Sequence, residues 1–338
     1  MRNIFIVASP LQLAGALEAK NKFNGVNSIF VVFIGKNELQ NSFMLKIIKR
    51  FIDDEIIYIH YTSDLWFLNR KMKLMKKMRN ERFLNLFIGD YREFSMRSFA
   101  CNLAYDKLFL LDDGNSTLVL NSQLVDHITS MRGSYGKMTV RDIFKQLLAY
   151  ANGLSVKRNV NINWFTMFEF KPLNNGEILK HQFEYLKSSA INVAWESNYS
   201  TKIYFIGGEM VKSGVMRSIE IYIDLIRKVR TYYAPFEFIY LPHRYEEKET
   251  LEVLANICDL KILRLDNIVE LGFIESNIVP SHICSFYSTA LYSLKLLYPH
   301  CSIEIVTLQK DLLNEEYIEA VENVQSYYKQ IFKTILLN

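Results

Sequence analysis

Residues Leu108–Gly114 have the sequence LFLLDDG, an apolar run that ends abruptly in two aspartates and a glycine. Such a run predicts a buried strand of a parallel sheet, and open α/β sheets bind ligands at the carboxyl ends of their strands. Successive strand residues point to opposite faces, so only one of Asp112 and Asp113 can face a reacting atom, and the other needs hydrogen bonds behind it. The alternative is a plain turn in which Gly114 adopts a positive φ.

Similar apolar or β-branched runs recur along the chain, separated by helical patterns. In the first half they are 4–8, 29–34, 56–59, 86–88 and 107–111, with 162–168 as a further candidate, and in the second half 203–206, 236–241, 261–265, 278–284 and 303–308. Strands that alternate with helices predict a doubly wound parallel sheet. We therefore expect an α/β protein with two Rossmann-like domains, 1–190 and 191–313, joined near the polar stretch 187–201. A C-terminal helix, 314–338, should pack on the domains.

Composition narrows the class of protein. Half of the 338 residues are apolar, enough for sizeable cores. No apolar run approaches the roughly 18 residues that span a bilayer, and the start is too short for a signal peptide, so we expect a cytoplasmic protein. The net charge of +4 argues against nucleic acid as a partner. The cysteines lack paired spacing and should be reduced; they are Cys101, Cys258, Cys284 and Cys301.

Positive charge is nevertheless concentrated between Trp66 and Arg82. Apolar residues recur there every three or four positions, which predicts a basic amphipathic helix. The basic residues are Arg70, Lys71, Lys73, Lys76, Lys77, Arg79 and Arg82. Such a helix could bind an anionic membrane surface or a polyanionic substrate. Alternatively, it is a solvated helix whose apolar stripe packs on its own sheet.

The second half places titratable groups after its own predicted strand, 236–241. Pro242, His243 and Arg244 follow it directly. Histidine can donate a proton near neutral pH, and an adjacent arginine can hold an anion, so the pair suits a phosphate leaving group. The alternative is a surface turn that begins at the proline.

Hydroxyl residues follow the next predicted strand. Ser285, Ser288 and Thr289 precede a leucine-rich helical pattern. At a helix start they could form an anion site together with backbone amides, or they could simply cap the helix. Between this segment and His243, Glu270 is a single carboxylate among apolar neighbours, which could accept hydrogen bonds from sugar hydroxyls.

Several nucleotide-binding motifs are missing from the sequence. Neither half has the dinucleotide glycine fingerprint or a phosphate-binding loop with lysine, which argues against dehydrogenases and nucleoside triphosphatases. The aspartates of the LFLLDDG stretch are adjacent, so they do not form the Asp-X-Asp pattern of a metal-held sugar nucleotide. We therefore expect no metal and no cofactor.

Together these segments resemble the bacterial sialyltransferases of glycosyltransferase family 52 and the related capsular polysialyltransferases of family 38. The resemblance covers most of the chain and rests on short segments in the same order: 9–12, 88–92, 111–114, 240–246 and 285–291. It implies a GT-B fold, with two Rossmann-like domains facing across a cleft. It also implies an inverting, metal-independent transfer of sialic acid from CMP-sialic acid.

The resemblance also implies roles for individual residues. Asp112 would be the general base, with Asp113 the second choice, and His243 the general acid or hydrogen-bond donor to the departing phosphate. Ser288 and Thr289 would hold that phosphate. The remaining donor-binding positions are Glu270 at the cytidine ribose, Pro242, Arg244 and Ser285, and the supporting positions are Gly114, Ser9 and Gln12. Many of these enzymes have proline after the histidine, where this chain has Arg244.

The implied partners are a CMP-sugar donor and a lipid-linked glycan acceptor, such as lipooligosaccharide, O-antigen or capsule. The acceptor would lie at the inner face of the cytoplasmic membrane, where the basic helix could contact anionic lipid. Closure of the cleft would bring Asp112 and His243 together around both substrates. Two alternatives remain: an enzyme of the same fold that uses another CMP-nonulosonic acid or a UDP-hexose, and a non-catalytic glycan-assembly protein.

Overall fold

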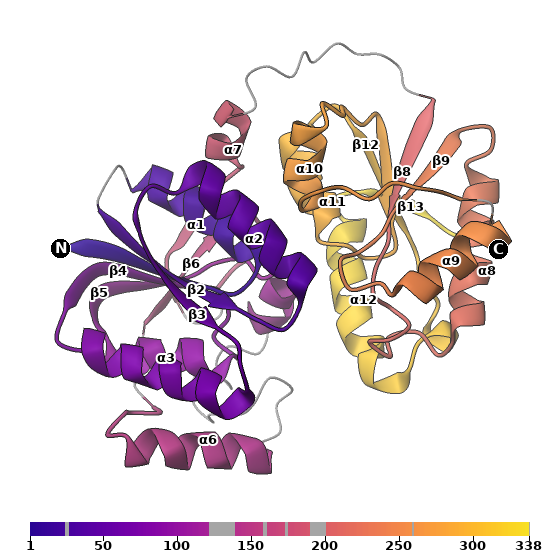
Figure 1. Cartoon of the computed structure of the whole chain (residues 1–338). Coiled ribbons are helices and arrows are strands. Elements are labelled where there is room, and N and C mark those ends of the chain that lie inside the picture. Colours follow the sequence, from indigo (N-terminus) through magenta and orange to yellow (C-terminus); the bar gives the residue numbers. More distant parts are fainter. Residues whose placement is uncertain are drawn as a thin grey trace. The chain divides into compact units, whose positions relative to one another are not determined.

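The computed structural model describes residues 1–23, 27–121, 139–157, 161–172, 175–189, 201–258 and 260–337. The chain divides into two compact units, Met1–Ser188 and Ser189–Asn338, each built on one parallel sheet with helices (Figure 1). The predicted α/β class with two parallel sheets is therefore confirmed. The cleft between the halves stays a prediction.

The first unit has a seven-stranded sheet in the order β3-β2-β1-β4-β5-β6-β7, and all of its strand pairs are parallel. The strands are β1 Arg2–Val7, β2 Ser28–Ile34, β3 Glu55–His60, β4 Arg82–Ile88, β5 Ala104–Leu110, β6 Ile162–Thr166 and β7 Ile178–Lys180. The order reverses between β1 and β4, so the topological switch point lies there. Ligands bind at such points, at the carboxyl ends of the strands.

Helices cover both faces of this sheet (Figure 1). They are α1 Pro10–Lys22, α2 Glu38–Phe51, α3 Asp64–Met78, α4 Phe94–Asn102, α6 Val140–Ala151 and α7 Glu184–Ser189. One face buries a row of stacked phenylalanines, Phe30, Phe5, Phe87 and Phe109, with ring centroids 4.6–5.1 Å apart. Phe23, just after α1, packs against this row. The other face packs against α3, α4 and the inner side of α6.

The second unit has a six-stranded parallel sheet in the order β10-β9-β8-β11-β12-β13, which reverses between β8 and β11. The strands are β8 Lys202–Ile206, β9 Glu237–Leu241, β10 Lys261–Ile262, β11 His282–Ser285, β12 Ser302–Val306 and β13 Lys333–Ile335. The helices are α8 Ile219–Tyr232, α9 Lys248–Cys258, α10 Val269–Glu275, α11 Ala290–Leu297 and α12 Glu315–Lys329, with a 3₁₀ turn at Lys310–Leu312. Each predicted strand of this half is present, although β10 is shorter than expected.

The sequence did not predict the edge strands β7 and β13, of three residues each. The C-terminal segment forms the expected helix, α12, but it then adds β13 to the second sheet, and Val321 of α12 packs in the core of that unit. Most of the expected linker lies outside the described residues, and its start belongs to α7.

The predicted basic helix is α3, with two corrections. It ends at Met78, and Arg82 begins β4 instead. Lys71 is buried rather than solvated: its Nζ lies 3.9 Å from the ring centre of Phe33, 4.2 Å from that of Phe67, and 3.5 Å from Glu93 Oε1. Burial lowers the pKa of Lys71. The apolar stripe of α3 does pack on its own unit, while its other basic residues stay exposed.

Among the described helices, none combines the length and apolar character needed to cross a membrane. Cys101, Cys284 and Cys301 are buried thiols that belong to no disulfide in the described part of the chain, as predicted, whereas the side chain of Cys258 lies outside the described residues.

Candidate active site

The predicted site residues of the first unit gather at its switch point. Segments 9–12, 89–92 and 112–114 follow β1, β4 and β5, which are neighbours in the sheet. Because the carboxyl ends of parallel strands meet at one edge, segments that lie far apart in sequence are brought together there.

Gln12 is the centre of this group. Ser9 caps α1 by accepting a hydrogen bond from the Gln12 backbone at 3.3 Å, which fixes where the helix starts. The Gln12 side chain accepts from Ala8 N (2.8 Å) and donates to Asp113 Oδ1 (2.7 Å). Gly89 provides the space, because a Cβ there would lie only 2.0 Å from Gln12 Cδ. Gln12 is thereby held in one orientation toward Asp113.

Asp113 combines this fixed hydrogen bond with access to solvent. Its side chain keeps 29% of its surface exposed, and Arg92 Nη2 lies 3.9 Å from its Oδ2. Arg92 also donates two 3.0 Å hydrogen bonds to Asp90. Gly114 has the positive φ, 69°, that the turn interpretation predicted. The turn and the candidate site are therefore the same structure.

Asp112 faces the interior and is only 2% exposed. Its Oδ1 accepts from Thr166 Oγ1 at 2.6 Å and its Oδ2 from Met167 N at 2.7 Å. His181 Nε2 lies 3.5 Å from Oδ2. The two aspartates thus divide as the strand alternation predicted, one exposed and one hydrogen-bonded behind it. Of the two carboxylates, that of Asp113 is the one that solvent reaches, and the assignment of the general base stays a prediction.

His181 was not identified from the sequence. It is 2% exposed, it stacks on Phe165 at 5.0 Å, and its second neighbour is Phe183. It follows β7, a strand that the sequence did not predict, and an isolated histidine carries no pattern.

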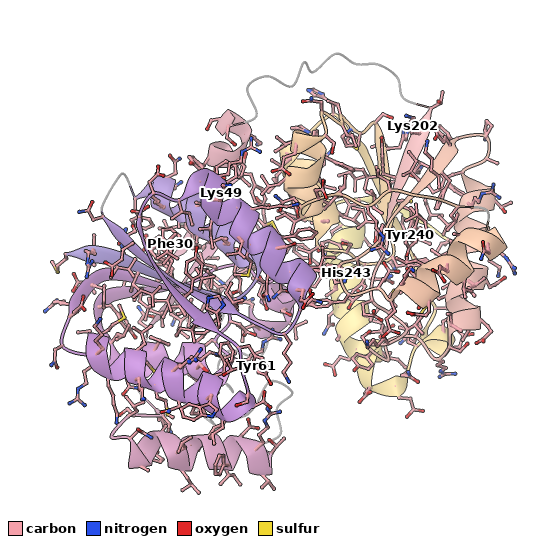
Figure 2. All side chains as sticks on the ribbon, in the orientation of Figure 1. Phe30, Lys49, Tyr61, Lys202, Tyr240 and His243 are labelled. Atoms are coloured by element: carbon pink, nitrogen blue, oxygen red, sulfur yellow. The ribbon has the colours of Figure 1, made fainter. Side chains whose placement is uncertain are left out.

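The second unit repeats the arrangement at its own switch point. Gly207, His243 and the hydroxyl segment 285–289 follow β8, β9 and β11, which are also neighbours in the sheet. Tyr240 lies in β9, and His243 lies just past the end of this strand (Figure 2).

A buried chain of hydrogen bonds supports the His243 loop. Tyr222 and Tyr240 hydroxyls are 2.6 Å apart, Tyr240 donates to Glu246 Oε1 at 2.5 Å, and Glu246 Oε2 accepts from His243 N at 2.5 Å. Gly207 makes room for this chain, because a Cβ there would lie 2.4 Å from the Tyr240 hydroxyl and 2.6 Å from Glu246 Oε2. Tyr222 was not identified from the sequence; the glycines that follow β8 were the only signal of close packing there.

Burial shifts the pKa values of this network. It raises the pKa of Glu246 to about 7 and raises the pKa of both Tyr222 and Tyr240 well above its ordinary value. Burial, with a smaller contribution from the adjacent Arg244 charge, lowers the pKa of His243 to about 3. The imidazole is therefore neutral at pH 7. Tyr245 N donates to its Nδ1 at 3.4 Å, so its Nε2 carries the proton and is a hydrogen-bond donor.

The three hydroxyl residues after β11 differ in their contacts. Ser285 is 3% exposed and donates to Ile206 O at 2.7 Å, so its hydroxyl holds β11 to β8. Ser288 and Thr289 are partly exposed at the start of α11. Ser288 Oγ accepts from Ala290 N at 3.3 Å, while the Thr289 side chain makes no cap bond.

Glu270 lies in the first turn of α10 and is 5% exposed. It accepts a 2.5 Å hydrogen bond from Ser293. Burial raises the pKa of Glu270, and the Arg244 charge acts in the opposite direction. Arg244, which follows Pro242 and His243, is therefore close enough to influence Glu270, and its guanidinium lies 4.9 Å from the ring centre of Tyr245.

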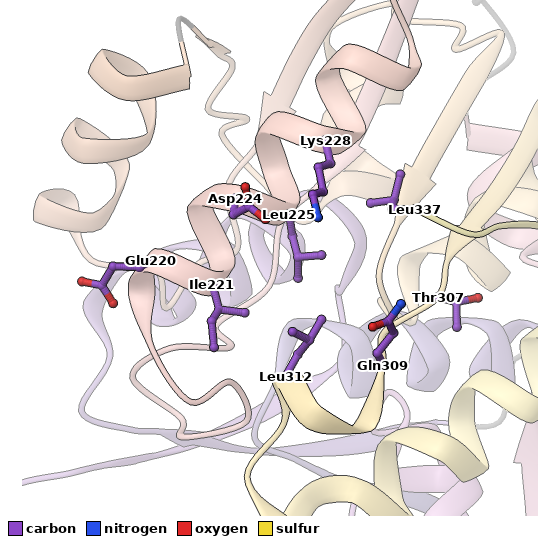
Figure 3. Close-up of a pocket in the computed structure, with 9 residues that line it drawn as sticks. All are labelled: Glu220, Ile221, Asp224, Leu225, Lys228, Thr307, Gln309, Leu312 and Leu337. Carbon is purple, nitrogen blue, oxygen red and sulfur yellow. Dashed lines mark ion pairs between the residues drawn. The ribbon is translucent and has the colours of Figure 1, made fainter.

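A separate pocket of about 360 Å³ lies in the same unit, between α8 and the segment after β12 (Figure 3). Its lining includes Asp224, Lys228 and Gln309, and none of the predicted site residues. In the described ranges, no group of three or more His, Cys, Asp or Glu side chains could hold a metal ion.

No protein-family model matches this chain, and no curated protein matches its sequence. Similar solved structures exist. The GT-B domain of a sialyltransferase from Photobacterium damselae is 11% identical, with 99% of each chain covered and a TM-score of 0.49.

Two further structures are similar. A 2,6-sialyltransferase from Photobacterium sp. JT-ISH-224, solved with CMP and lactose, is 9% identical over 98% of this chain and 78% of its own, with a TM-score of 0.48. A UDP-GlcNAc 2-epimerase from Neisseria meningitidis is 10% identical over 98% and 91%, with a TM-score of 0.47.

Proposed function

We propose that this chain is an inverting, metal-independent sialyltransferase that moves sialic acid from CMP-sialic acid to a glycan of the bacterial surface. One observation carries the proposal: the two sheets present complementary chemistry at their switch points. The first presents a carboxylate, Asp113, fixed by Gln12. The second presents a neutral histidine, His243, which Arg244 follows in the sequence, and the start of helix α11 lies at the same edge of this sheet.

Asp113 acts as the general base on the acceptor hydroxyl. It is exposed enough to meet a substrate, whereas both oxygens of Asp112 accept hydrogen bonds inside the fold. The Gln12 hydrogen bond fixes the direction in which the carboxylate faces, and general-base catalysis depends on that geometry. Asp112 positions the turn from behind.

The donor side stabilises the departing phosphate. As the acceptor oxygen forms its bond to the anomeric carbon, the bond from that carbon to the phosphate oxygen breaks, and CMP leaves with the electron pair. The acceptor proton passes to Asp113. His243 donates a hydrogen bond from Nε2 to the phosphate, and Arg244, Ser288 and Thr289 provide charge and hydroxyl groups around it.

Glu270 supports recognition of the ribose. The Arg244 charge acts on the pKa of this buried carboxylate, which supports a role for Glu270 as an acceptor of hydrogen bonds from sugar hydroxyls near the proposed phosphate site. The acceptor is a lipid-linked glycan, lipooligosaccharide, O-antigen or capsule, at the inner face of the cytoplasmic membrane. The proposed mechanism requires no cofactor, because Arg244 and the hydrogen-bond donors around the leaving phosphate stabilise its negative charge.

The test is to incubate the full chain with a panel of CMP- and UDP-sugars, with and without a chelator, and to measure nucleotide release. We expect CMP release from CMP-sialic acid at an unchanged rate in the presence of chelator, and a large loss in Asp113→Asn. Release only from another CMP-nonulosonic acid or a UDP-hexose would overturn the donor assignment. No release from any donor would favour a non-catalytic glycan-assembly protein.

A further inference from the structure

Helix α6 exposes a continuous apolar face. Its apolar side chains are largely solvent-accessible, with exposed fractions of 84% for Val140, 42% for Ile143, 55% for Phe144, 62% for Leu147 and 56% for Tyr150. We call these five residues the α6 face. Scattered exposed apolar residues are ordinary, but five on one short helix form a patch of the kind that marks an interaction site.

The α6 face is on the side of the helix that points away from the unit. At 100° per residue, its five positions fall within an arc of about 120°. The opposite side of the helix faces the protein: Ala149 is fully buried, and Asp142 forms a capping box with Thr139. The usual orientation of an amphipathic helix, with its apolar side against the core, is therefore reversed.

Two contacts hold α6 beside α3. Arg141 forms an ion pair with Asp64 at the start of α3, and Lys76 Nζ, near the end of α3, donates to Asn152 Oδ1 at 3.0 Å just after α6. The two helices therefore run side by side in the same direction (Figure 1). The ends of α6 are fixed, so its exposed apolar face has a defined position next to α3.

Helix α3 adds positive charge and a large aromatic side chain. Trp66 is 60% exposed and Leu65 54% exposed near its start. Further along, Arg70, Lys73 and Lys77 are exposed as well. The only acidic residue of α6, Asp142, is held in its capping box rather than in the α6 face.

From this juxtaposition we propose that the α6 face and the exposed side of α3 together dock onto the surface of an anionic lipid bilayer. Three features match the chemistry of the interface between headgroups and acyl chains. They are the apolar side chains of the α6 face, the exposed basic residues of α3 and the exposed indole of Trp66. The basic side chains of α3 are complementary to anionic headgroups. This inference is independent of the proposed catalytic activity.

The test measures binding of the full chain to lipid vesicles by co-sedimentation at low and high salt. One set of vesicles contains phosphatidylcholine alone, and the other contains roughly 25–30% of the anionic lipid phosphatidylglycerol, which attracts basic side chains. We expect binding to the anionic vesicles that weakens as salt rises. Phe144→Ser with Leu147→Ser should reduce binding at least tenfold, on the order of 1.4 kcal/mol. Lys73→Glu with Lys77→Glu should remove the preference for anionic lipid.

Matched controls come from α2 of the same unit. Leu45 is 43% exposed and Lys49 is exposed, so Leu45→Ser and Lys49→Glu change similar chemistry away from the α6 face and should leave vesicle binding unchanged. Circular dichroism should show the same fold in every variant. The proposal is overturned if wild type does not bind anionic vesicles, or if the α6 double variant binds equally well. A dimer that is lost in the α6 variant, without vesicle binding, would assign the face to a second copy.

Discussion

At the switch point of the first unit the chain presents a partly exposed carboxylate, whereas at that of the second it hides its carboxylate and presents hydrogen-bond donors. In the first, Gln12 donates to Asp113, which faces outward. In the second, Glu246 is buried and accepts from the backbone of His243. In both, a glycine after the central strand leaves room for the group that holds the loop. The same topology thus holds a partly exposed carboxylate in one unit and a buried one in the other.

The side chain packed behind each loop, Gln12 in the first unit and Glu246 in the second, therefore fixes the group that the loop carries. The Gln12 amide behind the loop of the first unit donates a hydrogen bond to the Asp113 carboxylate. The Glu246 carboxylate behind the loop of the second unit accepts from the backbone of His243 and so fixes the loop that carries the imidazole.

The largest expected effect separates the two aspartates. Asp113→Asn should reduce the transfer rate on the order of a hundredfold or more, since a general base is lost, with little change in thermal stability. In Asp112→Asn the amide NH₂ group replaces one carboxylate oxygen, so one of the two buried donors, Thr166 Oγ1 or Met167 N, loses its acceptor. This should destabilise the fold by about 1–3 kcal/mol. Rates and melting curves of both variants measure this. A hundredfold loss in Asp112→Asn, with Asp113→Asn near wild type, would restore Asp112 as the base.

The next effect concerns the buried carboxylate of the second unit. Because the pKa of Glu246 is raised to about 7 in the folded state, from 4.5, its contribution to stability is present below about pH 4.5 and is lost as pH rises through 7. The change is on the order of 3 kcal/mol. Denaturant unfolding of Glu246→Gln from pH 4.5 to 8 should lack this decline. Parallel pH curves for variant and wild type would contradict the assignment.

The glycines test the close packing behind both loops. Gly89→Ala and Gly207→Ala should each destabilise the protein by about 1–3 kcal/mol and slow transfer, because a methyl group would displace Gln12 or the Tyr240–Glu246 pair. Gly35→Ala is the control: it follows β2, with no atom within 4 Å of the new Cβ. Melting temperatures compare the three. Equal values would mean that the space at Gly89 and Gly207 is not needed.

The last effect concerns the titration of His243. Its pKa is lowered from 6.5 to about 3 in the folded state, so its contribution to stability is present above pH 6.5 and is lost as pH falls toward 3. The stability of His243→Asn relative to wild type should therefore increase as pH falls from 6.5. This trend is opposite to that of Glu246 between pH 4.5 and 6.5. A constant difference across this range would show that His243 titrates normally.

The sequence predicted both sheets because buried parallel strands are nearly continuous apolar runs. It missed β7 and β13, whose three residues are too few for any period and include a polar or charged position. It also placed Lys71 on a solvated face, because a lysine over two aromatic rings has the same helical position as an exposed one.

For the candidate site, motif order predicted which segments meet, because parallel strands bring their carboxyl ends together. Alternation along β5 predicted that the two aspartates face opposite ways, but not which of them faces the interior, because Phe109 and Leu110 show that both faces of the sheet are buried. The sequence did not identify Tyr222, the partner of Tyr240, or His181, which lies near Asp112. These contacts join segments far apart in the sequence, so only the folded structure shows them. The exposed face of α6 could not be told from a core-facing stripe, since both have the same period.

Calorimetric titration of CMP into the full chain measures the proposed division of labour between the two units directly. We expect Asp113→Asn to bind CMP with the dissociation constant of wild type while transfer falls on the order of a hundredfold or more. A variant with Ser288→Ala and Thr289→Val should weaken CMP binding about tenfold or more. Unchanged CMP affinity in that variant, or a large loss of affinity in Asp113→Asn, would contradict the claim that the second unit alone holds the donor nucleotide.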